Sequence, residues 1–214
     1  MGGPRDLRRS SRAKRRPRLA LTIFCEGSNT EPQYLLALAR AHSNPLVSVR
    51  IGPAKGVPLT LVQAARAEQR RQSQSRRDSF AARDEVWVVF DMDEHPNVAQ
   101  AMQEAAQADL RVAFSNPCFE IWPLLHLIEH DAPIDRHALQ RKLAGVMPGY
   151  NPKSGKIFDY TAMSDRFELA ARRARVMRDR RTAEGDLQGN PYTDVDCLAS
   201  IIIGNGKKMT AGER

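Results

Sequence analysis

The sequence has few cysteines and no long apolar run, and each shortage excludes a class of protein. The three cysteines, Cys25, Cys118 and Cys197, are odd in number and widely spaced, so they fit neither a disulfide framework nor a zinc motif. No apolar stretch approaches the roughly 18 residues needed to cross a bilayer. The apolar run 19–25 follows a basic segment but ends in Glu26 instead of a small-residue cleavage site, so we expect a strand and not a signal peptide. These shortages predict a cytoplasmic protein without a membrane association.

Positive charge is abundant but unevenly placed. The 214 residues include 33 Lys or Arg and 25 Asp or Glu, a net charge of +8. Residues 1–18 hold eight of the cations against one acid, Asp6, and therefore carry +7 of that charge. We expect a disordered basic tail that lies along phosphates; a tail that only aids solubility is an equal alternative. Residues 19–214 are predicted to form a single domain whose part from about 130 onward is helical.

Apolar strand patterns alternate with helical patterns over the first half of the chain. Strands are predicted at 19–25, 46–51, 86–90 and 110–114. The helices between them imply right-handed crossovers and an α/β fold, with a mainly parallel four-stranded sheet of order 2-1-3-4 flanked by helices. Additional C-terminal helices are predicted at 136–144, about 160–181 and 191–203.

The third strand runs directly into Asp91-Met92-Asp93. Side chains two apart on an extended backbone point the same way, so Asp91 and Asp93 leave the strand end as a carboxylate pair. A buried parallel strand that ends in two carboxylates is typical of a divalent-cation site. The alternative is that the acids only mark the exit of the strand into solvent and cap the next helix.

Sheet topology adds a third carboxylate to this pair. In the predicted order, strands one and three are neighbours roughly 4.8 Å apart, so Glu26 lies beside Asp91 and Asp93. Three such carboxylates repel one another unless a cation compensates them, which predicts a Mg²⁺ or Mn²⁺ site. Glu31, one helical turn beyond Glu26, is a further candidate ligand or orienting group. Lys153 or Lys156 is a candidate to neutralise a pentacovalent phosphate.

The segment 115–128 reads as a buried helix that is apolar nearly all round, with Pro123 expected to kink it or delay its start. Glu120 is its one acid, and burial requires that it meet a cation, a metal or a strong donor. The alternative is a partly exposed Glu in the first turn. We assign His126 and His130 packing or surface roles. The arginines of the helix 160–181 suit either a nucleic-acid face or a solvated surface.

Several motifs occur in the order found in one known family. The sequence resembles the RloB-like family at residues 24–27, 30–34, 89–93, 115–122 and 190–195. This family is similar to the Toprim fold, with a Glu after the first strand and an Asp-x-Asp after the third. The resemblance implies a metal-dependent nuclease subunit of restriction or abortive-infection loci, often encoded beside an AAA/ABC-type ATPase.

The family's roles carry over by motif. They imply Glu26 as general base or metal ligand, Asp91 and Asp93 as metal ligands, and Glu31 and Glu120 as further site residues. Three departures are Pro123 in a segment usually continuous, Ser28-Asn29 after the glycine, and a stretch ending at Lys153 that only loosely matches Tyr-x-Lys.

The leading hypothesis is therefore a Toprim-like, Mg²⁺-dependent nuclease of phage defence that acts on DNA or RNA, tRNA included. A second is a non-catalytic adaptor that binds a partner or nucleic acid through its arginines. A glycosyltransferase, whose Asp-x-Asp also holds a metal, is disfavoured because no second nucleotide-binding half is visible. Haloacid-dehalogenase chemistry is disfavoured because position 95 is His, which does not fit that motif. The Asp-x-Asp also follows the third strand, whereas in that class it opens the domain.

Overall fold

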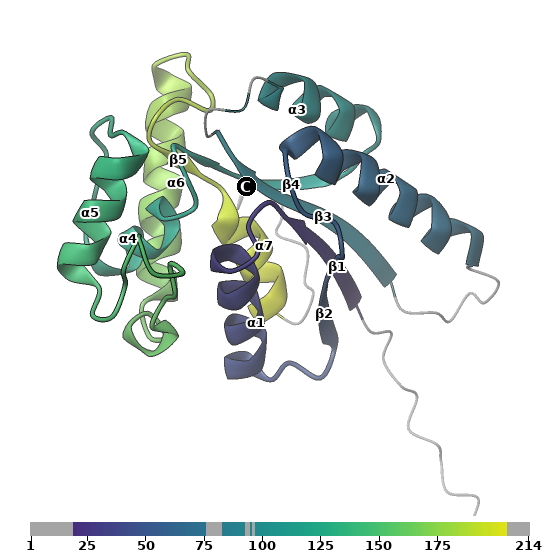
Figure 1. The fold of residues 1–214 in the computed structure, drawn as a ribbon, viewed down its shortest axis with the longest axis horizontal. Helices are drawn as coiled ribbons and strands as arrows, with labels where there is room; N and C mark the ends of the chain where they lie inside the picture. The colour runs from purple at the N-terminus through teal and green to yellow at the C-terminus, as the bar shows by residue number, and fades with distance from the viewer. Residues whose placement is uncertain (1–18, 76–82, 93–94, 96, 205–214) are drawn as a thin grey trace, which may run out of the picture.

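A five-stranded sheet forms the centre of the protein (Figure 1). The computed structural model describes residues 19–75, 83–92, 95 and 97–204, so the predicted basic tail lies outside the described residues. The strands are β1 Leu19–Cys25, β2 Val47–Ile51, β3 Arg83–Asp91, β4 Arg111–Asn116 and β5 Tyr192–Thr193. Their order is β2-β1-β3-β4-β5, and the first four are parallel. The α/β class and the order of these four strands are confirmed.

The predicted number of strands was wrong. Tyr192 and Thr193, assigned to a helix, form β5 and pair antiparallel with Asn116 and Ser115 of β4. The last helix, α7, begins only at Val195. Two residues are too few for an alternating pattern, so only the long-range pairing with β4 defines this strand.

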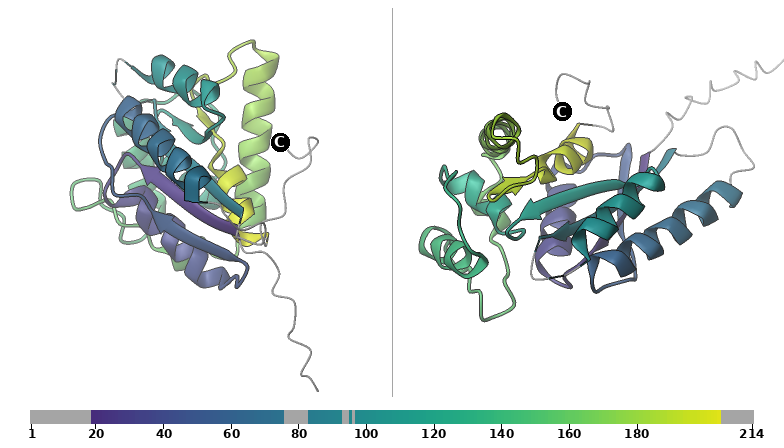
Figure 2. Two further views of the ribbon diagram at one scale, coloured as in Figure 1. Left: turned by 90° about the vertical axis from the view of Figure 1, so that its right-hand side faces the viewer. Right: turned by 90° about the horizontal axis from the view of Figure 1, so that it is seen from above.

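Helices cover both faces of the sheet. On one face lie α2 (Pro58–Ser75) and α3 (Val98–Gln107), side by side in Figure 2. On the other lie α1 (Thr30–His42) and α7 (Val195–Ile203). The remaining helices, α4 (Ile121–Leu127), α5 (Arg136–Val146) and α6 (Phe167–Ala183), gather beyond the β4–β5 edge (Figure 1). Within the described residues, no helix combines the length and the apolar character that crossing a membrane requires.

The central strand β3 is buried on both faces, as its apolar run predicts. Trp87 and Val89 belong to the core beneath α1 and α7. Val88 and Phe90 belong to the core beneath α2 and α3. Because successive side chains point to opposite faces, one continuous apolar run supplies both cores. Asp91 ends the strand and shares the face of Val89.

The starts of two helices depend on local features of the sequence, a proline in one case and a capping aspartate in the other. Pro123 occupies the first turn of α4, where its missing N–H costs little, so the helix begins at Ile121 as the predicted delay requires. The helix predicted at about 160–181 instead begins at Phe167. Before it stands the 3₁₀ turn η1 (Tyr160–Ala162), in which the Thr161 N–H donates to the Asp159 carboxylate. The helical pattern that starts near residue 160 therefore forms this short turn first, and α6 begins only at Phe167.

Candidate active site

Glu26 and Asp91 lie together at the carboxyl ends of β1 and β3. The parallel register pairs Cys25 with Val89, and the next N–H, that of Glu26, donates to Val89 O at 3.1 Å. The Asp91 N–H in turn donates to Glu26 Oε2 at 3.4 Å. The Glu26 carboxylate is therefore folded over the end of the neighbouring strand, where the predicted strand order requires it.

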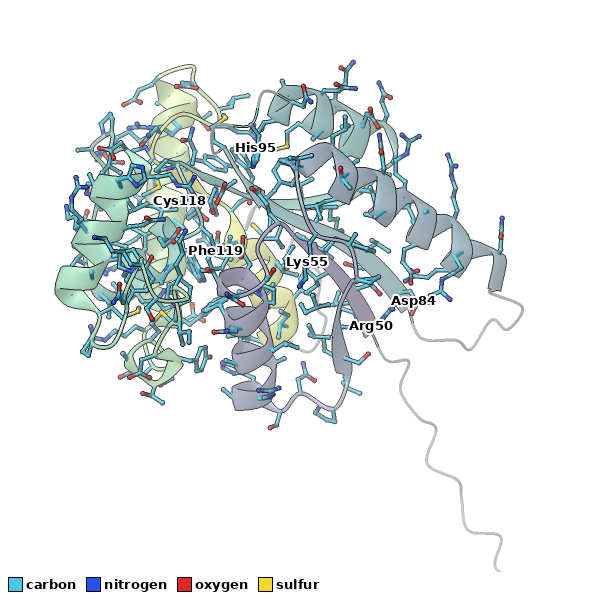
Figure 3. The ribbon with its side chains drawn as sticks, in the orientation of Figure 1. Arg50, Lys55, Asp84, His95, Cys118 and Phe119 are labelled. Atoms are coloured by element: carbon cyan, nitrogen blue, oxygen red, sulfur yellow. The ribbon has the colours of Figure 1, made fainter. Side chains whose placement is uncertain are left out.

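His95 is a member of the site that the sequence patterns did not single out. Its Nε2 lies 2.9 Å from Glu26 Oε1, and the two side chains are 30% and 15% exposed. The ring comes from the segment that follows β3, near the end of that strand (Figure 3). A histidine four residues after Asp91 is the only sequence signal, and it does not reveal the contact.

Asp91 connects β3 to the loop before α4. Asp91 Oδ2 accepts the Phe119 N–H at 3.2 Å, and the Asp91 residue is 8% exposed. Figure 3 labels Phe119 and its neighbour Cys118 on this loop. The hydrogen bond fixes the loop against the strand end and thereby brings the next residue, Glu120, into the same region. Two motifs that are distant in the sequence thus meet.

Glu31 is buried in the first turn of α1 and folds back on the loop after β1. Its Oε1 accepts the Gly27 N–H at 3.3 Å, and a Cβ atom at position 27 would collide with Glu31 Oε2. Burial raises the pKa of Glu31 to about 7; backbone hydrogen bonds oppose the rise, and the charges of Glu120 and Glu26 add to it. Among the described residues, Glu31 Oε2 has no hydrogen-bond partner. Glycine at position 27 leaves room for this carboxyl group.

Glu120 is buried at 2% exposure and is surrounded by donors. Its Oε1 accepts from Tyr150 Oη at 2.9 Å and Gln140 Nε2 at 3.1 Å, and Lys156 Nζ lies 3.4 Å away. Burial works against ionisation, but Lys156, the Cys118 thiol and the other donors outweigh it and lower the pKa of Glu120. The expectation that a buried Glu120 meets a cation and strong donors is confirmed, and the alternative of partial exposure is wrong.

Both candidate lysines belong to the loop 150–156. Lys156 contacts Glu120, whereas Lys153 is exposed on the same loop and lines a cavity together with Lys156. The contact between Lys156 and Glu120 places one of the two candidates next to the acidic residues. The role assigned to Lys153 stays a prediction.

The donor set suits a hard divalent cation only in part. Glu26, Asp91 and Glu31 supply carboxylate oxygens, the ligands that Mg²⁺ and Mn²⁺ prefer, and Glu31 Oε2 lacks a hydrogen bond from any described residue. Within the described ranges, no three His, Cys, Asp or Glu side chains are grouped to hold a metal ion. Asp93, the other predicted ligand, lies outside the described residues. The metal site stays a prediction.

Other charged residues have structural roles. His126 is buried, its Nδ1 lies 3.0 Å from Trp122 O, and burial lowers its pKa to about 4. This neutral, packed ring agrees with the packing role assigned to it. On α6, three arginines are used internally, and they donate to Leu125 O, to Asp196 and to Asn190 O. They are Arg173, Arg178 and Arg181. The helix is therefore not simply a solvated or nucleic-acid face.

Sequence comparison now assigns the chain to a family. Residues 21–202 match the model of the RloB-like protein family, so the chain belongs to the RloB-like family. Comparisons with curated proteins and with solved structures gave no match.

Proposed function

We propose that the protein is a divalent-metal-dependent nuclease of phage defence, with a Toprim-like centre and an AAA/ABC-type ATPase as partner. One observation carries the proposal: Glu26 and Asp91 meet at the carboxyl ends of two adjacent parallel strands. In open α/β sheets this edge is where functional sites occur. Membership of the RloB-like family supports the same conclusion.

Glu26, Asp91 and Asp93 would hold Mg²⁺ or Mn²⁺. When bound, such a metal supplies an activated water and stabilises the attacking and leaving oxygens of a phosphodiester. His95 holds one oxygen of the Glu26 carboxylate, which orients the other oxygen toward Asp91. Glu26 then acts as ligand or as general base.

The buried acids have separate tasks. Glu31, with a pKa near 7, exchanges a proton close to neutral pH and is suited to accept one from water. Glu120 stays ionised and fixes Lys156, and it is a further candidate metal ligand. Lys156, or Lys153 on the same loop, neutralises charge that develops on the phosphate.

The test combines cleavage and metal binding. Purified protein is incubated with Mg²⁺ or Mn²⁺ and plasmid DNA, single-stranded DNA or tRNA, alone and with the candidate ATPase. We expect Glu26→Gln and Asp91→Asn to lower the cleavage rate by about a hundredfold or more, because each replaces a carboxylate that would bind the metal by a neutral amide. Matched controls are Glu129→Gln and Asp179→Asn, which change exposed acids outside the site in the same way.

Two results contradict the proposal. Cleavage that survives in both site variants removes the mechanism. Calorimetric titration that detects no binding of millimolar Mn²⁺ by the wild-type protein removes the metal site, whether or not a partner is needed for cleavage. Metal binding that Asp91→Asn abolishes supports the site independently of activity.

A non-catalytic, nucleic-acid-binding adaptor is the second candidate. A cavity lined by four cationic side chains favours it, because binding of phosphate requires no metal. Binding of a nucleic-acid strand without binding of a divalent cation would favour the adaptor over the nuclease.

A further inference from the structure

A cationic cavity lies between the start of α5 and the loop 150–156. Its volume is about 550 Å³, within the usual range of roughly 300–1,000 Å³ for ligand sites. The described residues that line it include four cations and no acid, together with Gln140 and His137. The four cations are Arg136, Arg141, Lys153 and Lys156. Such a concentration of one sign of charge is suited to an anion.

The acid that precedes α5, Asp135, does not line the cavity. Asp135 precedes the helix, and its Oδ1 accepts the Ala138 N–H at 2.9 Å, so it serves as the N-cap. That hydrogen bond, followed by a second backbone bond and the charges of Arg141 and His137, lowers the pKa of Asp135. Asp135 is exposed and stays committed to the backbone.

Two residues that line the cavity contact Glu120. Gln140 and Lys156 line the cavity, and both contact Glu120 Oε1. Glu120 follows Phe119, whose N–H donates to Asp91. This chain of contacts connects the cavity, through Glu120, to the loop that Asp91 holds.

We infer that this cavity binds the backbone phosphates of a nucleic-acid strand next to the bond at the Glu26–Asp91 site. The inference rests on the proposed function for the placement of the scissile bond, but strand binding itself requires no cleavage. Arg141 and Lys153 are exposed and free of the contacts to Glu120 that occupy Lys156, so they are the residues to test. A small phosphorylated molecule offers the same chemistry, and the experiment separates the two.

The experiment measures fluorescence anisotropy of a labelled 12-nucleotide strand and of a labelled mononucleotide, both in EDTA. The double variant Arg141→Gln, Lys153→Gln is compared with Lys142→Gln, Arg172→Gln. The control pair makes the same two changes; Lys142 contacts His130, and Arg172 is exposed on α6. We expect Kd for the strand to rise at least tenfold in the cavity variant and less than threefold in the control.

The salt dependence provides a second measurement. Each phosphate contact to a single strand contributes roughly 0.7 to the slope of log K against log salt, so the slope should fall by about 1 to 1.5 in the cavity variant only. Equal weakening in both double variants, or no strand binding by the wild type, overturns the inference. A mononucleotide that binds as tightly as the strand also overturns it and assigns the cavity to a nucleotide. Because EDTA prevents metal-dependent cleavage, failure of the nuclease proposal leaves this result interpretable.

Discussion

Acidic side chains in two regions of the protein are held in opposite ways. Near α6, Asp196 is 1% exposed, and its two oxygens accept from Arg178 at 2.6 and 2.9 Å in a bidentate pair. Arg178 also donates to Thr193 O, so the cation ties α7 to β5. At the other site, Glu26, Asp91 and Glu31 receive backbone N–H groups and one histidine. Asp196 is thus committed to the fold.

The pKa shifts express the same difference. Burial alone would lower the pKa of Arg178, but the hydrogen bonds and charge of Asp196 outweigh it and raise that pKa. For Glu31, burial and neighbouring carboxylates raise the pKa instead, which means that the folded protein resists ionisation there. The fold thus stabilises the pair of Asp196 and Arg178, whereas it holds ionised Glu31 at a cost to stability, which is typical of functional sites.

The largest effect is expected from breaking the structural pair. Arg178→Met leaves the Asp196 carboxylate buried without its cation, and we expect a loss of about 3–5 kcal/mol in the free energy of unfolding. Urea unfolding measures it. The double variant Arg178→Met, Asp196→Leu should recover most of the loss, since no buried charge remains. A single variant as stable as the wild type would show that the pair has no structural role.

Removing the charge of Glu31 is expected to stabilise the protein. Its folded-state pKa of about 7 exceeds the usual 4.5. The wild-type protein therefore loses stability as the pH rises from about 4.5 to about 7, and it loses no more from this group at higher pH. Glu31→Gln does not titrate, so we expect it to be more stable than the wild type by up to about 3 kcal/mol at pH 8 and nearly equal at pH 4. Denaturation at the two pH values measures the difference, with Glu129→Gln as control. A variant that is less stable at pH 8 would mean that the folded protein does not disfavour the ionised form of Glu31.

A divalent cation should relieve the repulsion at the acidic site only. We expect Mn²⁺ at ten times its Kd to stabilise the wild type by about 1.4 kcal/mol, as mass action requires. Arg178→Met should keep this increment, and Asp91→Asn should lose it. An equal increment in wild type and Asp91→Asn, measured by thermal unfolding, would place the cation elsewhere.

The smallest effect on stability is expected at His95. The contact with Glu26 is partly exposed, so His95→Gln should change the unfolding free energy by less than about 1 kcal/mol. If the ring orients the Glu26 carboxylate, cleavage should nevertheless fall by about tenfold or more. Unchanged cleavage would reduce His95 to a surface contact.

Residues close together in the sequence determined much of the candidate site. The apolar run 86–90 predicted a strand buried on both faces, and the alternation of strands and helices predicted the order that puts Glu26 beside Asp91. The burial of Glu120 followed from its apolar neighbours. In each case a local pattern has only one compatible environment, because period and hydrophobicity fix which side of an element is buried.

Only the tertiary structure decided the other features. β5 exists because two residues meet β4 across a long separation, and Lys156 rather than Lys153 reaches Glu120 because of the path of the loop 150–156. His95 against Glu26 and the cationic cavity beside α5 likewise depend on segments with no common sequence pattern. The physical reason is that the sequence by itself specifies local periodicity and burial, whereas contacts between side chains of distant segments depend on how the whole chain packs.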